Sequence, residues 1–201
     1  MKKLIFYSCC IVTIVFLSKC KKAKALDMNK KEAYKPIDTL QEMITRGAYL
    51  VNTIGCDDCH SPKKMTPKGP VPDLERRFSG YSGDEPLPKI NKNDIEPGKW
   101  MLMNGDLTAF VGPWGVSFAS NLTPDPTGLG NWTFKNFKTA LSEGKFKGIE
   151  NQRMLLPPMP WQNFRKLTDS DLRAMFEYFK TVKPINNIVP SPIPLTNIND
   201  K

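Results

Sequence analysis

Cys56-Asp57-Asp58-Cys59-His60 is the stretch of this 201-residue sequence that is most informative about the fold and the cofactor site. Two thiols separated by two residues, with a histidine directly after the second, have the spacing typical of covalent haem attachment. Each thiol can add to one vinyl group of a porphyrin, and the histidine then lies under the iron as its proximal ligand. The motif therefore predicts one covalently bound haem c, attached at Cys56 and Cys59 and ligated by His60.

Two other uses of such a motif are disfavoured. A structural zinc site needs about four closely spaced ligands, but His60 is the only histidine and no second cysteine pair has this spacing. A thioredoxin-like redox pair works through a thiolate, whereas Asp57 and Asp58 lie between the two thiols and raise their pKa. Haem attachment is thus the interpretation that uses all three side chains.

The first 25 residues have the pattern of an export leader. A basic start at Lys2-Lys3 precedes an apolar run over residues 4–17, which suits a signal peptide and is short for a membrane span. Three fates stay open: a lipoprotein leader lipidated at Cys20, cleavage after Ala25, or an uncleaved anchor. Each places the motif outside the cytoplasm, so we predict a protein that is periplasmic or membrane-anchored and facing the periplasm.

The net charge of +9 is concentrated in this leader. Residues 1–25 hold six of the 29 basic residues and none of the 20 acidic ones, which leaves +3 for residues 26–201. A nucleic-acid-binding domain needs a clustered basic surface. The balance of the remaining chain therefore predicts no nucleic-acid partner.

A polar, Lys-rich linker over residues 26–36 is predicted to join the leader to one domain, residues 37–201, which ends in a Pro-rich tail. Three amphipathic helices are predicted in this domain, each from a capping residue, an apolar stripe and a stop signal. With cap and stop residues included, they run from Asp38 to Gly55, from Thr133 to Gly144 and from Thr168 to Pro184. Gly47 in the first helix either lets another helix approach closely or is an indifferent surface glycine.

Residues 61–120 contain eight prolines and seven glycines, which interrupt regular structure. Large apolar side chains such as Phe78 and Trp100 argue against disorder in this segment. We expect a long irregular insertion between the motif and the second helix, folded over one edge of the porphyrin. A basic cluster near the motif either steers an acidic redox partner or is ordinary solvated surface; it consists of Lys63, Lys64 and Lys68.

The sixth position of the iron is the remaining question about the site. A single histidine excludes bis-histidine ligation within one chain. Met159 is the strongest candidate, because the prolines at 157, 158 and 160 restrict its backbone and can hold the thioether at low entropic cost. A core role for Met159, a Lys or Tyr ligand and an open site are the alternatives. The other methionines that could ligate are Met154, Met101, Met103 and Met65.

Five separated motifs carry a family resemblance. They are Arg46-Gly-Ala-Tyr-Leu50, Cys56-Asp-Asp-Cys-His60, Asn121-Leu-Thr-Pro-Asp125 with Thr127-Gly-Leu-Gly-Asn-Trp132, Pro157-Pro-Met-Pro-Trp161, and Thr168-Asp-Ser-Asp-Leu172 with Tyr178. In this order, over about residues 40–190, they resemble class I c-type cytochromes. The resemblance is to single-haem, exported bacterial proteins similar to the cytochrome subunits of periplasmic dehydrogenases.

The resemblance implies an all-α, cytochrome c-like fold in which the first and last helices cross beside the haem. It also implies that Cys56 and Cys59 form the thioethers, that His60 is the proximal ligand and that Met159 is the distal one. Many relatives carry two or three haem motifs, whereas this chain carries one.

His–Met ligation leaves no vacant iron position, so the expected function is electron transfer and not catalysis. The expected partners are a dehydrogenase, oxidase or reductase on the outer side of the inner membrane. Two other functions stay open: a haem subunit of a larger oxidoreductase complex, and a gas-binding or sensing haem protein with an open or labile sixth position.

Overall fold

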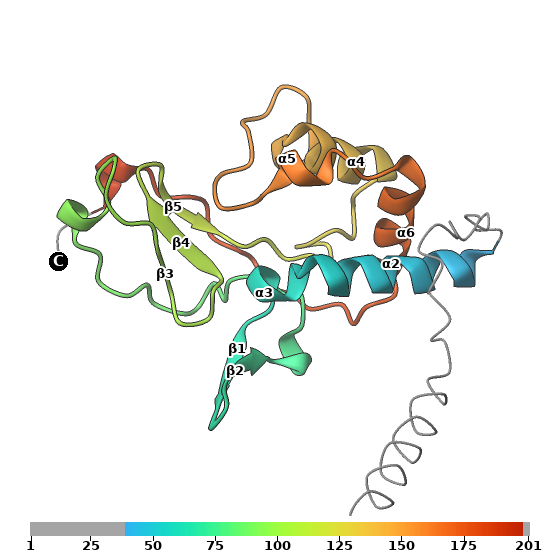
Figure 1. Ribbon diagram of the computed structural model, residues 1–201, viewed down its shortest axis with the longest axis horizontal. Coiled ribbons are helices and arrows are strands. Elements are labelled where there is room, and N and C mark those ends of the chain that lie inside the picture. The colour runs from blue at the N-terminus through green and yellow to red at the C-terminus, as the bar shows by residue number, and fades with distance from the viewer. Residues whose placement is uncertain (1–38, 199–201) are drawn as a thin grey trace, which may run out of the picture. The chain divides into compact units, whose positions relative to one another are not determined.

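Residues 39–198 are described by a computed structural model of the chain (Figure 1). The predicted leader and linker, together with Cys20 and Asp38, lie outside the described residues. Within the described part, no helix has the length and apolar character needed to span a bilayer.

Helix α2 (Leu40–Ile54) leads the chain into the cysteine motif. The Thr39 hydroxyl accepts a hydrogen bond from the amide of Glu42, and the Glu42 carboxylate accepts one from the amide of Thr39, which completes a capping box. Gly55 ends the helix in a left-handed conformation, as predicted. The predicted cap at Asp38 is wrong by one residue, because Asp and Thr are both good caps and each is followed three residues later by Gln or Glu.

The two later helices begin where they are predicted, but the last one ends at Phe179, before the predicted stop at Lys183 and Pro184. Helix α4 spans Phe134–Glu143 and helix α6 spans Asp169–Phe179. The hydroxyls of Thr133 and Thr168 each accept an amide hydrogen bond from the first turn, which would otherwise be unpaired. Shorter helical segments also occur: α3 (Cys56–His60), α5 (Trp161–Phe164) and 3₁₀ turns at Leu74–Arg76, Lys92–Asp94, Phe146–Gly148 and Leu195–Asn197.

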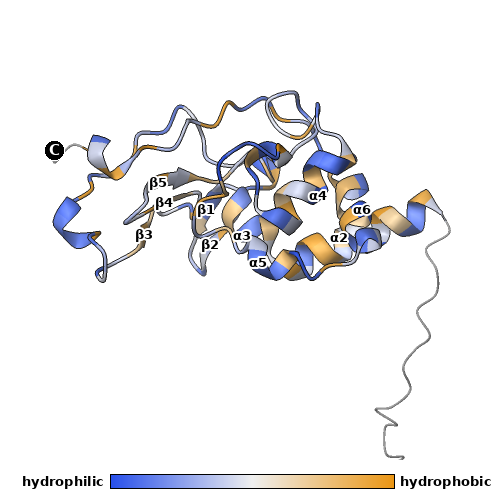
Figure 2. Cartoon of the chain, turned by 90° about the horizontal axis from the view of Figure 1, so that it is seen from above, coloured by the Kyte–Doolittle hydropathy of each residue, from blue (hydrophilic) through white to orange (hydrophobic). Residues whose placement is uncertain are grey.

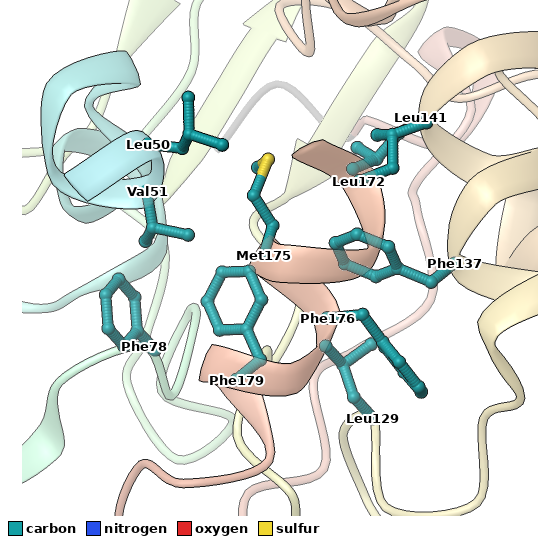
Figure 3. Packing of buried hydrophobic residues seen from close by; sticks show 10 residues of the cluster. All are labelled: Leu50, Val51, Phe78, Leu129, Phe137, Leu141, Leu172, Met175, Phe176 and Phe179. Atoms are coloured by element: carbon teal, nitrogen blue, oxygen red, sulfur yellow. The ribbon is translucent and has the colours of Figure 1, made fainter. Parts of the chain in front are cut away.

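The long helices bury their apolar faces in one core. Figure 2 shows apolar and polar residues alternating around α2, α4 and α6, as expected for helices with one buried face. The Phe179 ring packs edge-on to Phe78 with centroids 5.3 Å apart, and it lies 6.0 Å from the ring of Phe137. The core cluster (Figure 3) consists of Leu50, Val51, Phe78, Leu129, Phe137, Leu141, Leu172, Met175, Phe176 and Phe179.

Helices α2 and α6 meet closely at Gly47. A Cβ added to Gly47 would lie 2.0 Å from the carbonyl oxygen of Ala174, inside the van der Waals distance. Beside this contact, Arg46 Nε donates to Asp171 Oδ1 at 2.9 Å and joins the two helices. The interpretation of Gly47 as a close-packing residue is therefore confirmed, and the surface-glycine alternative is wrong.

The fold is mixed, with helices and two antiparallel sheets, so the predicted all-α class is wrong. One sheet is a hairpin, and the other has three strands in the order β3-β4-β5 (Figure 1). All five strands lie in the segment expected to be irregular: β1 (Lys63–Thr66), β2 (Gly69–Pro72), β3 (Leu102–Met103), β4 (Ala109–Gly112) and β5 (Gly115–Phe118).

The positions of proline and glycine explain this error. Thr66 pairs with Gly69 and Gly112 pairs with Gly115, so a two-residue turn closes each of these hairpins. Most of the punctuating residues stand at or near turns, where they permit strands on either side. Strands of four residues or fewer are too short for their alternating pattern to stand out in the sequence.

The Pro-rich tail lies against the three-stranded sheet. Val116 in β5 and Ile193 in the tail exchange two backbone hydrogen bonds, with N···O distances of 2.7 and 3.0 Å. The side chains of Ile95, Val111, Val116 and Ile198 are buried together as a second, smaller cluster. The sheet therefore has its own apolar support, separate from the core shown in Figure 3.

Candidate functional site

The structure brings Cys56, Cys59 and His60 together on the short helix α3. Side chains three and four residues apart are neighbours on a helix surface, so the Cys56 side chain lies beside those of both Cys59 and His60. Gly55 makes the turn from α2 into α3 with φ of 83°, a conformation that favours glycine. Both thiols are free and half-buried.

The His60 imidazole is fixed in the orientation that a metal ligand requires. Its Nδ1 lies 2.7 Å from the carbonyl oxygen of Ser120, which can only accept, so Nδ1 carries the proton and Nε2 keeps its lone pair. Burial lowers the pKa of His60, and the hydrogen bond to Ser120 opposes this only in part. A neutral imidazole with a free Nε2 is the form that binds iron.

The thiols of the apoprotein are protonated. Burial, together with the charge of the neighbouring Asp57, raises the pKa of Cys56 to about 12. Burial and Asp58 raise the pKa of Cys59 as well. Neutral thiols disfavour thiolate redox chemistry. Residues 39–198 also contain no group of three or more His, Cys, Asp or Glu side chains that could hold a metal ion.

Asp57 fixes α3 to the two helices that cross at Gly47. Arg77 Nε donates to both Asp57 carboxylate oxygens at 2.9 and 3.0 Å, and Arg77 also donates to Tyr178 in α6 and Asn52 in α2. Burial pushes the pKa of Asp57 upward, but the hydrogen bonds from Arg77 and Ser61 and the charges of Arg77 and Lys63 together lower it. The orientation of the motif is therefore set by a charged group twenty residues further along the chain.

Two lysines of the predicted steering cluster bind groups of the same chain. Lys63 Nζ donates to the carbonyl oxygens of Asp57 and Asp58 at 3.0 and 3.1 Å, where a cation stabilises the C-terminal end of α3. Lys64 Nζ lies 2.8 Å from Asp73 Oδ1, and this hydrogen bond contributes most to lowering the pKa of Asp73 to about 2. These contacts favour a structural role for Lys63 and Lys64 over steering.

Met159 is the methionine candidate that packs against the core. Its half-buried side chain contacts the core cluster of Figure 3, and so does Cys56 from the motif. The other four methionines considered are exposed, with exposed fractions of 40% for Met154, 66% for Met101, 58% for Met103 and 77% for Met65. Burial against the same cluster as a motif cysteine thus favours Met159 over each of the four.

The loop that carries Met159 is tied to the sheet. Ser117 Oγ in β5 donates to the carbonyl oxygen of Pro157 at 2.6 Å, and Trp114 Nε1 donates to Ser117 Oγ at 3.2 Å. Neither Ser117 nor Trp114 is identifiable as a site residue from the sequence, because β5 itself carries no strong strand signal. Two surface hollows contain none of the motif residues: one is lined by residues of α2 between 41 and 49, the other by residues 135, 136 and 148–151.

No family model matches the chain. The chain is similar to cytochrome subunits of dehydrogenases. Over 75 residues, 36% of the chain, it is 40% identical to the cytochrome c subunit of alcohol dehydrogenase (quinone) from Gluconobacter oxydans, of which it covers 15%. Over 87 residues, 42% of the chain, it is 37% identical to the fructose dehydrogenase cytochrome subunit from Gluconobacter japonicus, of which it covers 17%.

A longer and weaker match agrees with these two. Over 138 residues, 68% of the chain, the sequence is 25% identical to the gluconate 2-dehydrogenase cytochrome c subunit from Pantoea cypripedii, of which it covers 22%. The chain therefore spans less than a quarter of each of these three relatives. Similarity to cytochrome c subunits of dehydrogenases agrees with the resemblance carried by the five motifs.

Proposed function

We propose that this chain binds one haem c covalently and acts as a non-catalytic electron-transfer subunit of a periplasmic dehydrogenase. The observation that carries the proposal is the geometry of α3, where Cys56 lies beside both Cys59 and His60 and where the Nδ1 of His60 is held by Ser120. The similarity to cytochrome subunits of three dehydrogenases supports the subunit role over that of a free carrier.

The donor set fits a haem. Cys56 and Cys59 would form the thioethers, His60 would be the proximal ligand and Met159 the distal one. When bound, the haem supplies a one-electron centre, and His–Met ligation raises its reduction potential relative to harder ligand sets. The chain's own part is to fix the imidazole through Ser120, to orient α3 through Arg77 and to exclude water with the core cluster.

Export and membrane attachment belong to the same proposal. Residues 1–25 would deliver the chain to the periplasm, where Cys20 could carry a lipid anchor. A subunit that is anchored near a membrane-bound dehydrogenase needs no long-range steering surface. This agrees with the bonds that Lys63 and Lys64 make to groups of the same chain.

Replacing Met159 with alanine tests the iron ligation. The mature holoprotein is expected to show a low-spin haem that does not bind carbon monoxide when reduced, because the thioether fills the sixth position. Met159→Ala is expected to become fully high-spin and to bind carbon monoxide, whereas the control Met101→Ala, at an exposed side chain, keeps the wild-type absorption spectrum. If the wild type itself bound carbon monoxide, the site would be open, and gas binding would replace electron transfer as the best function.

Purification from membranes tests the subunit role. An affinity-tagged full chain, extracted in mild detergent, is expected to co-purify with a dehydrogenase, so that ethanol, fructose or gluconate reduces its haem. A doubly substituted Cys56→Ala/Cys59→Ala chain is the matched control, since its motif has no thiol to retain the haem. A monodisperse monomer whose haem none of these compounds reduces would contradict the subunit role and favour a free carrier.

A further inference from the structure

Strand β5 and the two residues after it contact both segments that would supply iron ligands. The Ser120 carbonyl accepts from His60 Nδ1 at 2.7 Å, and Ser117 Oγ donates to the Pro157 carbonyl at 2.6 Å. Ser117 and Ser120 are three residues apart in the chain, but His60 and Pro157 are 97 residues apart. One short segment therefore fixes the positions of the two candidate ligand segments relative to each other.

The Met159 loop depends on an outside donor because of its composition. Pro157, Pro158 and Pro160 have no amide hydrogen, so in residues 157–160 only Met159 can donate from the backbone. The Met159 amide is used locally, by the Leu156 carbonyl at 3.3 Å. Among the described residues, the bond from Ser117 is the one hydrogen bond that joins residues 157–160 to a distant part of the fold.

Trp114 fixes the direction of that hydrogen bond. An indole Nε1 can only donate, so Ser117 Oγ accepts from Trp114 and turns its single proton toward the Pro157 carbonyl. Consecutive hydrogen bonds of this kind strengthen one another where they are shielded from water. Ser117 is in such a place, because only 6% of its surface is exposed. The indole packs on Gly112, where an added Cβ would lie 2.5 Å from the ring.

We infer that Ser117 and Trp114 are positioning residues that hold the Met159 thioether on the haem iron through the Pro157 carbonyl. The inference rests on the proposed function and extends it, since it assigns a role to the segment between the motif and α4. If the hydrogen bond from Ser117 to the Pro157 carbonyl is lost, the Met159 amide still bonds to Leu156. The thioether is then expected to leave the iron more readily when another ligand competes.

The test compares full-length holoprotein variants by competition for the sixth position. Ser117→Ala removes the donor, and Trp114→Phe keeps the ring but removes the indole N–H. Ser142→Ala is the matched control, because Ser142 Oγ also donates to a backbone carbonyl at 2.6 Å, that of Lys138 within α4. The readouts are the far-red charge-transfer band of a ferric haem with a thioether ligand, and the affinity of the ferric protein for added imidazole.

Ser117→Ala is expected to weaken the charge-transfer band and to raise the apparent affinity for imidazole about tenfold, the effect of losing one buried hydrogen bond. Trp114→Phe is expected to shift the affinity in the same direction by about threefold, because the serine proton is no longer directed. Ser142→Ala is expected to keep the wild-type affinity even where its thermal stability falls. Trp114→Phe provides the measurement if Ser117→Ala does not fold.

The outcomes separate the inference from the proposed function. If Ser117→Ala and Trp114→Phe match the wild type while Met159→Ala loses the charge-transfer band, Met159 is the ligand and the positioning role is wrong. If Met159→Ala itself retains the band, the proposed ligation is wrong, and the positioning role is overturned with it. An equal rise in imidazole affinity for Ser142→Ala would assign the effect to lost stability and would also overturn the positioning role.

Discussion

Replacing both Cys56 and Cys59 with alanine is expected to abolish covalent haem attachment. Each thioether requires one thiol, and residues 37–201 contain no other cysteine, because Cys9, Cys10 and Cys20 all precede this range. Either single variant is expected to keep at most one thioether. The mass of the denatured protein checks this, since covalent haem stays with the chain and non-covalent haem is lost.

Asp58→Asn is the matched control for the cysteine variants. Asp58 is an exposed residue of the same short helix, between the two thiols, and its replacement leaves both of them in place. This variant is expected to carry one covalent haem per chain. The double alanine variant is also expected to unfold at a lower temperature than the holoprotein, because a group that binds only the folded state stabilises it. A stable covalent adduct in the double variant would overturn the haem assignment.

The helices and the motif were predictable because their signals are local. A capping residue, an apolar stripe and a stop signal all lie within one helix length, which is why α4 and α6 begin where Thr133 and Thr168 place them. The cysteine motif is equally local, since its five residues form one short helix. The one-residue error at the start of α2 arose where two consecutive positions carried equivalent caps.

The sheet and the fixed geometry of the site were not predictable, because they depend on contacts between distant segments. His60 meets the carbonyl of Ser120, and every residue has a carbonyl, so no residue type marks this partner. Arg77 is one of 29 basic residues, and its contact with Asp57 depends on how the chain turns after β2. The strands themselves are short and separated by turns rich in proline and glycine, which hid them in a segment expected to be irregular.

Helices α2 and α6 are each predictable from local sequence, but their contact at Gly47 joins distant segments of the chain. A substitution at Gly47 therefore tests the fold directly. Gly47→Ala is expected to lower the free energy of unfolding by about 2 kcal/mol, although alanine is the better helix former by about 1 kcal/mol. The added Cβ would lie 2.0 Å from the Ala174 carbonyl oxygen and 2.8 Å from Tyr178 Cβ. The helices must then move apart, which strains the hydrogen bond between Arg46 and Asp171. Denaturant unfolding of the holoprotein measures the difference.

Gly105→Ala is the matched control for this effect. A Cβ added to Gly105 meets no atom within 4 Å, and Gly105 is exposed in the turn between β3 and β4. Its replacement is expected to change the free energy of unfolding by less than about 0.5 kcal/mol. If Gly47→Ala were as stable as the wild type, or more stable because of its helix propensity, α2 and α6 would not meet at this residue. Arg77, which orients the motif through Asp57, would then lack its hydrogen bond to Tyr178 of α6.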